Sequence, residues 1–360
     1  MNRCPACGTQ YADEARFCTK DGSKLIPLPG AKPASGVGHP TPARGTAAGR
    51  AEQAPPVSPT NLVDQVLDGR YRIVRKVGEG GMSFVYLAND TATTDRYAIK
   101  VLSHALSSDQ NAMQRLKREA SLGMRLAHAN ICHIIRMGET QDGLVYVVMP
   151  FVEGEILSDR NNRKGTLSLA ETTRFVSEIA AGLHVAHELK IVHRDLKPEN
   201  IMICKSEDGS ERAVVMDFGL AKERRADAEL QKLTATGIIL GTPEFMSPEQ
   251  LRGKPLDPRT DVYSLALMTY EMLTGKLPFQ GRTQQEMMIA RLRGKPKMLR
   301  EIKPDLPARL EQVLNKAMAL DPGDRFASMA AFADAFTAAA AEKTDSAPGE
   351  GGLLGKLFGR

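Results

Sequence analysis

The stretch IVHRDLKPENIMI, residues 191–203, gathers the side chains most capable of chemistry. Between two apolar pairs it contains six polar residues, His193, Arg194, Asp195, Lys197, Glu199 and Asn200. A solvated turn needs no such selection. A buried turn tolerates these charges only when they pair with one another or with a ligand. The stretch therefore predicts a functional site.

A glycine-rich segment, VGEGGMSFVY at residues 77–86, lies between two strand-like patterns. Gly78, Gly80 and Gly81 allow a tight turn whose backbone N–H groups could approach a phosphate, and Val85 could cover an aromatic base. Hairpins also use glycine, so this segment alone leaves a plain turn as the alternative.

The next strand pattern, YAIKVL, contains Lys100 among apolar neighbours, where a lone lysine is normally excluded. It needs an anionic partner. Glu119, on the helix predicted to follow, is a natural counter-ion that would hold the lysine against nucleotide phosphates. The alternative is that Glu119 faces solvent among neighbouring basic residues.

A β-like run ends at Asp217 in the stretch VVMDFGLAK. Asn200 and Asp217 can supply oxygen ligands to Mg²⁺, which bridges nucleotide phosphates. Asp195 is then left to orient and deprotonate an attacking hydroxyl. Asp217 alone would be interpreted as a turn residue, so its significance comes from the set.

The secondary structure predicted around these residues changes along the chain from mostly strands to mostly helices. Alternating and β-rich runs from Tyr71 to about residue 152, with one helix near residues 107–128, predict a strand-rich lobe. Beyond Gly154 the patterns are mostly helical. Ser168 and Glu171 predict a capping box that opens a helix, and DVYSLALMTYEML is apolar nearly all round, which predicts a buried central helix.

The composition excludes several classes of protein. The net charge of +5 over 360 residues is mild and interspersed, so nucleic-acid binding is not expected. No apolar run approaches the roughly 20 residues that span a bilayer, and no signal-peptide core opens the chain. Three of the five cysteines fall within the first eighteen residues, which favours a metal site in a reducing compartment. We expect a cytoplasmic protein without a transmembrane segment.

The chemical motifs together resemble the eukaryotic-like (Hanks-type) protein kinases, and most closely the bacterial serine/threonine branch. The glycine-rich loop, strand lysine, helix glutamate, His-Arg-Asp…Asn loop and Asp-Phe-Gly occur in the family order over roughly residues 71–335. The resemblance implies an α+β, two-lobed protein kinase fold. Its N-lobe, residues 71–152, would be an antiparallel sheet with one helix, and its C-lobe, residues 153–335, mostly helical.

The resemblance also implies roles for individual residues. Asp195 would be the catalytic base, Lys197 would steady the γ-phosphate, Lys100 would contact the α- and β-phosphates, and Glu119 would position Lys100. Asn200 and Asp217 would bind Mg²⁺, for which Mn²⁺ can substitute. The expected ATP site comprises Val77, Gly78, Glu79, Gly80, Gly81, Met82, Ser83, Phe84, Val85, Ala98, Lys100, Met149, Pro150, Val152 and Met202. Pro150 replaces a common Glu but keeps the carbonyl that accepts from adenine, and Val152 would still offer its N–H.

Regulatory positions follow from the same resemblance. Arg194 would await a phosphate on the activation segment, and Thr234 and Thr236 match the doubly phosphorylated Thr-x-Thr of the bacterial branch. Autophosphorylation in trans would require transient self-association. Lys197 and Thr242 are similar to the serine/threonine pattern, which disfavours a tyrosine kinase. Glu249, closing the activation segment, is expected to pair with Arg325.

The N-terminal segment, residues 1–26, resembles a small zinc ribbon. Cys4, Cys7 and Cys18 have knuckle spacing, and Asp21 stands where a fourth cysteine would be. Zn²⁺ accepts carboxylate oxygen, so a Cys₃Asp site is feasible, with His39 as the runner-up ligand. The alternative is a vestigial knuckle held by turn glycines. Residues 27–65 are rich in Pro, Gly and Ala and predict a linker, and residues 344–360 a disordered tail.

These observations predict a serine/threonine protein kinase that transfers the γ-phosphate of ATP to protein Ser/Thr hydroxyls in cytosolic signalling. The alternative is a pseudokinase scaffold that binds partners without transferring phosphate. Retention of Lys100, Asp195, Asn200 and Asp217 together argues against it, since a scaffold has no need of all four.

Overall fold

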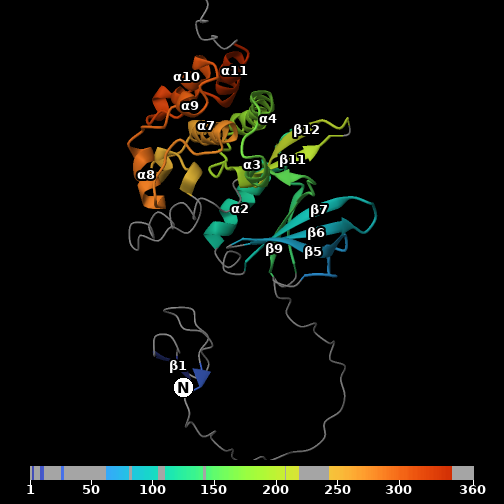
Figure 1. The fold of residues 1–360 in the computed structure, drawn as a ribbon. Helices are drawn as coiled ribbons and strands as arrows, with labels where there is room; N and C mark the ends of the chain where they lie inside the picture. The colour runs from blue at the N-terminus through green and yellow to red at the C-terminus, as the bar shows by residue number, and fades with distance from the viewer. Residues whose placement is uncertain are drawn as a thin grey trace, which may run out of the picture. The chain divides into compact units, whose positions relative to one another are not determined.

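The computed structural model divides into two units, Met1–Pro55 and Pro56–Arg360 (Figure 1). It describes residues 2–3, 9–11, 26–27, 62–80, 83–103, 110–140, 143–206, 208–218 and 243–342, apart from the side chains of residues 2–3, 10–11, 26–27, 110–112, 115 and 119. The first unit contains three two-residue strands, β1 (Asn2–Arg3), β2 (Gln10–Tyr11) and β3 (Ile26–Pro27), paired antiparallel in the order β2-β1-β3.

The second unit begins with a six-stranded sheet of order β4-β5-β6-β7-β9-β8, antiparallel at every pairing. Its strands are β4 (Val66–Leu67), β5 (Tyr71–Gly80), β6 (Ser83–Asp90), β7 (Arg96–Leu102), β8 (Arg136–Glu139) and β9 (Val145–Pro150). The alternation expected of a half-buried strand is clear at the start of β5, where Tyr71 and Ile73 are buried and Arg72 and Val74 are exposed. The predicted antiparallel N-lobe sheet is confirmed.

Both faces of this sheet are apolar. One face packs an aromatic-rich cluster that includes Tyr71, Tyr86 and Tyr146. The other face packs Ala98, Val147 and Met149 against helix α2 (Gln110–Gly123), whose Met113, Leu116 and Ala120 complete a second cluster. This second face also carries the strand lysine, so packing of α2 determines what surrounds it.

The sheet starts further towards the N-terminus than the strand patterns indicate. Strand β4 pairs with β5, and Leu62 is 1% exposed within the aromatic cluster. Leu62 lies in the range 27–65 that the composition predicts to be linker, and β4 begins directly after that range. The short apolar segment LVDQVL, residues 62–67, follows a Pro- and Ala-rich stretch and was therefore not predicted as part of the sheet. It completes the edge of the sheet.

The helical lobe is built around α7 (Pro258–Thr274), which is buried over nearly its whole circumference, as predicted (Figure 1). The surrounding helices are α3 (Leu157–Lys164), α4 (Leu169–Glu188), α6 (Pro248–Leu251), α8 (Gln284–Leu292), α9 (Leu299–Ile302), α10 (Ala308–Ala317) and α11 (Met329–Ala340). Short 3₁₀ turns are η1 (Pro198–Asn200), η2 (Pro243–Phe245) and η3 (Pro322–Asp324). Of the helices in the described ranges, none has both the length and the apolar surface needed to cross a bilayer.

Helix α4 begins where the capping pattern places it, but only half of the predicted box forms. The Ser168 hydroxyl accepts the backbone N–H of Glu171 at 3.2 Å. The Glu171 carboxylate instead accepts from Arg160 and Lys164. Tertiary ion pairing has therefore displaced the reciprocal local bond. Along one face of α4, Phe175, Ile179, Leu183 and Ala186 are fully buried, as the helical spacing predicts.

A small sheet, β10 (Glu155–Ile156), β11 (Ile201–Lys205) and β12 (Glu211–Val215), joins the lobes in the order β10-β11-β12. Gly154 is required at its entry, because a Cβ there would stand 2.3 Å from the carbonyl oxygen of Ile203. The hairpin β11–β12 also pairs with the loop after α2 through an isolated bridge from Ile131 to Val215. It is therefore held from both lobes.

The predicted pair between Glu249 and Arg325 forms in the helical lobe. Two bonds of 2.7 Å join the guanidinium to the carboxylate, and both side chains are buried. Thr260 donates to the same carboxylate at 2.8 Å. Burial alone would raise the pKa of Glu249, but the bonds from Arg325 hold that pKa below its ordinary value. The pair ties α6 to the start of α7 and to the turn before α11.

Candidate active site

The loop between α4 and η1 is held by one buried carboxylate. Asp261, in the first turn of α7, is 0% exposed. Its Oδ2 accepts the backbone N–H of His193 at 2.8 Å, and its Oδ1 accepts the N–H of Arg194 at 3.0 Å. His187 approaches Oδ2 through Nε2 at 2.7 Å. The loop's backbone conformation is thus set by α7, the most buried helix of the lobe.

The ionised state of Asp261 follows from these partners. Burial penalises the carboxylate, yet His187 and the backbone N–H of His193 hold the pKa of Asp261 below its ordinary value. Charge-assisted acceptors of this kind are stronger than neutral ones. An ionised Asp261 therefore stabilises the loop at neutral pH.

His193 connects this loop to the segment that follows β12. Its Nε2 lies 2.9 Å from the carbonyl oxygen of Met216, and its Nδ1 accepts the backbone N–H of Asp195 at 3.3 Å. A carbonyl can only accept, so the proton belongs on Nε2 and the ring is neutral. The ring also packs edge-on against Phe218 at 4.9 Å between centroids. His193 is completely buried, and its role here is to join two loops.

Asp195, Lys197 and Asn200 come together at the end of the loop. Nδ2 of Asn200 donates to the Asp195 carbonyl at 2.6 Å and to its carboxylate at 3.0 Å. Lys197 Nζ stands 3.4 Å from the same carboxylate. Because the amide nitrogen is turned toward Asp195, the amide oxygen is the atom of Asn200 able to coordinate a cation.

Lys100 reaches this group from the other lobe. Its side chain, 9% exposed, donates from Nζ to Oδ1 of Asp217 at 2.7 Å. In the sheet Lys100 lies opposite Val85 on β6 and Val147 on β9, so its stem is enclosed by apolar neighbours. The anionic partner predicted for Lys100 is therefore supplied by Asp217. The side chain of Glu119, the partner proposed from sequence, lies outside the described side chains.

Two residues of this group adopt a left-handed backbone. Arg194 has a φ of 66° and Asp217 a φ of 56°. Non-glycine residues enter this region at an energetic cost, and such residues concentrate at functional sites. At both positions the hydrogen bonds described above fix the neighbouring backbone.

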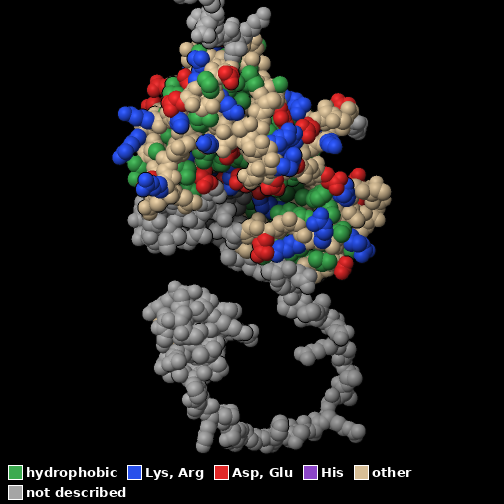
Figure 2. Space-filling view, in the orientation of Figure 1, with side chains coloured by type: hydrophobic (Ala, Val, Ile, Leu, Met, Phe, Trp, Pro, Cys, Tyr) green, Lys and Arg blue, Asp and Glu red, His purple; other side chains and the backbone are tan. Residues whose placement is uncertain are grey.

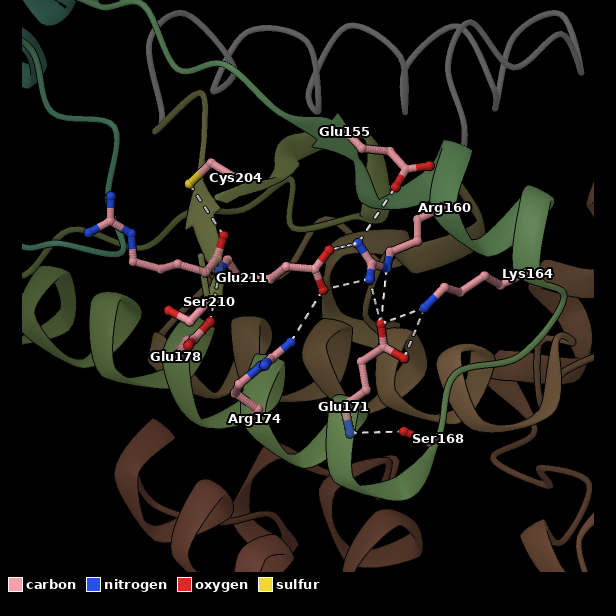
Figure 3. A network of polar contacts seen from close by, with 12 residues as sticks. Glu155, Arg160, Lys164, Ser168, Glu171, Arg174, Glu178, Cys204, Ser210 and Glu211 are labelled. Carbon is pink, nitrogen blue, oxygen red and sulfur yellow. Dashed lines mark hydrogen bonds and ion pairs between the residues drawn. The ribbon is translucent and has the colours of Figure 1, made fainter. Parts of the chain in front are cut away.

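The hairpin β11–β12 places Asn200 before its first strand and Asp217 after its second. A network of ion pairs anchors its distal half to α3 and α4 (Figure 3). Arg160, 5% exposed, donates to Glu211 on β12 at 2.7 and 2.9 Å and to Glu171 on α4 at 2.6 and 3.1 Å. Glu155 lies 3.6 Å from the same guanidinium.

Charge balance explains how this network tolerates a buried arginine. The bonds from Arg160 hold the pKa of Glu211 below its ordinary value despite partial burial. For Glu171 burial opposes ionisation, but Lys164 and Arg160 still lower its pKa. The cluster is ionised at neutral pH, and it holds the hairpin rigidly against the helical lobe.

The residues expected to line an ATP site gather on β5, β6, β7 and β9. In register, Gly78 lies opposite Val85, Glu79 opposite Phe84, and Gly80 opposite Ser83. Ala98 lies opposite Met149, and Val77 lies on β5 next to Gly78. Met202 on β11 lies opposite Ile156 on β10, the strand that follows residues 151–154 between the two lobes. Figure 2 shows the surface hollowed where the lobes meet, with charged side chains of both signs at the hollow.

The linker between the lobes has one unexpected contact. The carbonyl oxygen of Pro150 receives the Cys132 thiol at 3.7 Å. A carbonyl has two lone pairs, so this long contact leaves capacity for another donor. Burial raises the pKa of Cys132 to about 12, with Asp217 adding to the effect. The thiol therefore stays protonated, as expected for a buried small hydrophobe.

Several sequence predictions fall outside the described residues. They are Gly81 and Met82 in the glycine-rich turn, the Glu119 side chain, Thr234, Thr236 and Thr242, the tail 344–360, and Cys4, Cys7, Cys18, Asp21 and His39. Within the described ranges, no cluster of three or more His, Cys, Asp or Glu side chains is arranged to hold a metal. The zinc prediction rests on residues beyond those ranges.

Sequence reasoning did not find His187, Gln250 or Arg160. Gln250 donates from Nε2 to the Arg194 carbonyl at 2.7 Å and so binds the loop from α6. These residues act through tertiary contacts between distant segments. Arg160 and His187 stand in helix-forming stretches of the sequence. Their residue types alone do not identify the distant residues to which they bond.

Residues 71–337 match the family described as protein kinase domain. The chain is similar to serine/threonine-protein kinase Pkn1 of Myxococcus xanthus, with 38% identity over 94% of this chain and 46% of that protein. It is also similar to serine/threonine-protein kinase PrkC of Bacillus subtilis, with 34% identity over 74% of this chain and 37% of that protein. The chain thus spans less than half the length of these two curated relatives.

A solved structure agrees with these matches. The Mycobacterium tuberculosis PknI kinase domain is 29% identical, aligns with a TM-score of 0.60, and covers 78% of this chain and 100% of its own.

The anchoring role of Asp261 predicts the effect of Asp261→Asn. An amide retains one acceptor oxygen but turns its NH₂ toward a backbone donor, so at least one charge-assisted bond is lost. We expect the free energy of unfolding to fall by about 3 kcal/mol. Hydrogen exchange at the His193 and Arg194 amides should accelerate. Urea unfolding and exchange mass spectrometry measure the two effects.

Asp257→Asn is the matched control, because Asp257 caps the same helix but bonds to Arg259 rather than to the loop. It should leave exchange at both amides unchanged. The folded pKa of Asp261 lies below its ordinary value. The stability it contributes is therefore complete above that ordinary value and is lost as pH falls through the folded pKa. Equal exchange in both variants would contradict the anchoring role.

Proposed function

The chain belongs to the protein kinase family, and from this premise we propose that it is a serine/threonine protein kinase using ATP. The observation that carries the proposal is the 2.7 Å bond between Lys100 and Asp217. It joins the lobes at the point where Asp195 and Asn200 also meet. A buried lysine on one lobe and three polar side chains on the other form a site suited to a charged, phosphate-bearing substrate.

The proposed chemistry follows from the positions of these groups. Asp195 would accept the proton of a serine or threonine hydroxyl while the hydroxyl oxygen bonds to the γ-phosphorus of ATP. The bond from that phosphorus to the bridging oxygen breaks, and ADP leaves. Asn200 holds the Asp195 carboxylate in place, and Lys197, 3.4 Å from it, would neutralise charge on the transferring phosphoryl group.

The donor set supports Mg²⁺ as the metal. Hard divalent cations prefer carboxylate and amide oxygens, which Asp217 and the Asn200 side chain offer at the same open end of the β11–β12 hairpin. When bound, the ion would neutralise phosphate charge, and Mn²⁺ can take its place. Lys100 would then contact the α- and β-phosphates, and we propose that Glu119 on α2 helps to position Lys100.

The proposed nucleotide site combines the glycine-rich turn with the apolar face of the sheet. Gly78 to Val85 would cover the phosphates, and Ala98, Met149 and Met202 would enclose the adenine. The Pro150 carbonyl and the Val152 N–H would bond its edge. The pairing of Gly78 with Val85 and of Ala98 with Met149 in adjacent strands supports this arrangement.

A regulated cycle is proposed from the sequence pattern. Thr234 and Thr236 would be autophosphorylated in trans during transient self-association, and a phosphate there would pair with Arg194. Thr242 and Lys197 support serine/threonine over tyrosine specificity. The division into a module at 1–26, a linker at 27–65 and a kinase domain at 71–335 stays a prediction, as does a cytoplasmic location.

For the N-terminal module we propose zinc bound by Cys4, Cys7, Cys18 and Asp21. The spacing of the three cysteines supports this proposal, and three thiolates with one carboxylate satisfy the tetrahedral preference of Zn²⁺. Elemental analysis of the purified full-length chain should find one zinc per chain. Cys7→Ser should reduce that content, and a metal-free wild type would contradict the proposal.

Phosphate transfer itself is tested by incubating the purified chain with Mg-ATP and mapping phosphopeptides by mass spectrometry. We expect phosphate on Thr234 or Thr236 and on a generic acceptor, myelin basic protein. Asp195→Asn should lower the rate by about 10²- to 10⁴-fold, the contribution typical of a general base.

The conservative Glu153→Gln variant controls for charge loss, because Glu153 is exposed and pairs only with Arg96 among the described residues. It should transfer phosphate at the wild-type rate. A folded wild type that binds ATP but phosphorylates neither itself nor myelin basic protein would favour the scaffold alternative.

A further inference from the structure

A buried arginine from a distant helix holds the turn that follows residues 219–242. Arg291, near the end of α8, is 1% exposed. Its Nη1 donates to the carbonyl oxygens of Pro243 at 2.5 Å and of Met246 at 3.1 Å, and its Nη2 donates to the carbonyl of Glu244. One guanidinium therefore binds two carbonyls of the η2 turn and that of Met246, which follows it.

The chemistry of this contact is unusual for a buried charge. The partners of the guanidinium are backbone carbonyls, and the Phe279 ring covers it at 5.9 Å from the centroid. Burial lowers the pKa of Arg291, which indicates that the desolvation cost is incompletely offset. Simple packing at this point would be served better by an apolar side chain. The rigid fork of arginine instead specifies the backbone conformation of the turn.

The η2 turn lies beside the candidate active site. After burial, the largest influence raising the pKa of Glu244 is Glu199, and Lys197 acts in the opposite direction, so both loop residues lie within electrostatic range of the turn. Just beyond the turn, Gln250 on α6 donates to the Arg194 carbonyl. The turn is also bound from α7, where the Ser264 hydroxyl donates to the Phe245 carbonyl at 2.8 Å.

This placement matters for an acceptor protein. A serine or threonine hydroxyl that reaches Asp195 brings flanking peptide past Lys197 and Glu199, whose charges act on Glu244 of the η2 turn. The backbone of η2 becomes part of the surface that an acceptor segment contacts. Its conformation depends on three bonds from Arg291.

We propose that Arg291 is a positioning residue for the acceptor protein, holding η2 in the conformation against which the phosphorylated segment docks. The inference rests on the proposed kinase function and extends it to one determinant of acceptor binding. Arg291 contacts neither the nucleotide side of the site nor the residues proposed to bind metal. Its loss should therefore affect the acceptor and leave ATP binding unchanged.

The test compares Arg291→Lys with Arg293→Lys, an exposed arginine at the end of the same helix. The acceptor is a synthetic peptide of residues 228–240 or myelin basic protein, whichever the wild type phosphorylates. Arg291→Lys should raise the KM for the acceptor about tenfold, as expected when one or two hydrogen bonds are lost. The KM for ATP and the rate of ATP hydrolysis without acceptor should stay within about twofold of wild type. Arg293→Lys should change none of these values.

If Arg291→Lys raises the KM for the acceptor and the KM for ATP by the same factor, the proposal is overturned and Arg291 has a purely structural role. If Arg291→Lys does not fold, exchange mass spectrometry on the wild type decides. Adding the peptide with Thr234 and Thr236 replaced by alanine, together with a non-hydrolysable ATP analogue, should protect the amides of residues 244–246. Absence of that protection would also overturn it. A wild type that phosphorylates neither acceptor contradicts the proposed function instead.

Discussion

The arrangement of the whole site depends on a single buried carboxylate. Asp261 receives two successive backbone N–H groups and His187, and it does so from the most buried helix of the lobe. A turn with charged side chains and a left-handed residue, Arg194, would otherwise have many conformations. Hydrogen bonds to an ionised acceptor select one of them. The charged side chains can then point toward a ligand because the backbone beneath them is already satisfied.

Two sets of contacts connect this loop to its surroundings. His193 bonds to the segment after β12. Arg160 fixes the hairpin β11–β12, which brings Asn200 and Asp217 together. Lys100 then closes the arrangement from the opposite lobe. On the other side Gln250, Glu249 and Arg325 bind the loop and α6 to the remainder of the helical lobe. Most buried charges here connect segments that are far apart in sequence, which is where directional bonds specify what apolar packing leaves open.

Local patterns predicted much of this structure. The strands from Tyr71 onward, the Ser168 cap and the buried helix α7 all form. The pair between Glu249 and Arg325, which the family resemblance implied, forms as well. What the patterns did not predict depends on tertiary competition. Glu171 abandoned its capping bond for Arg160, Lys100 pairs with Asp217, and β4 joined the sheet from a Pro-rich neighbourhood. The role of Arg291 could not be predicted either, because a single basic residue on a helix does not indicate which distant carbonyls it will bond.

We propose that Asn200 and Asp217 bring a divalent cation to the nucleotide phosphates beside Lys100. The most direct test is a crystal structure of the chain grown with Mn²⁺ and a non-hydrolysable ATP analogue, with anomalous scattering used to locate the metal. We expect a manganese peak bonded to oxygen atoms of both Asn200 and Asp217, with Lys100 Nζ directed at the phosphates. A bound nucleotide whose manganese touches neither residue, or a nucleotide away from Lys100, would contradict it.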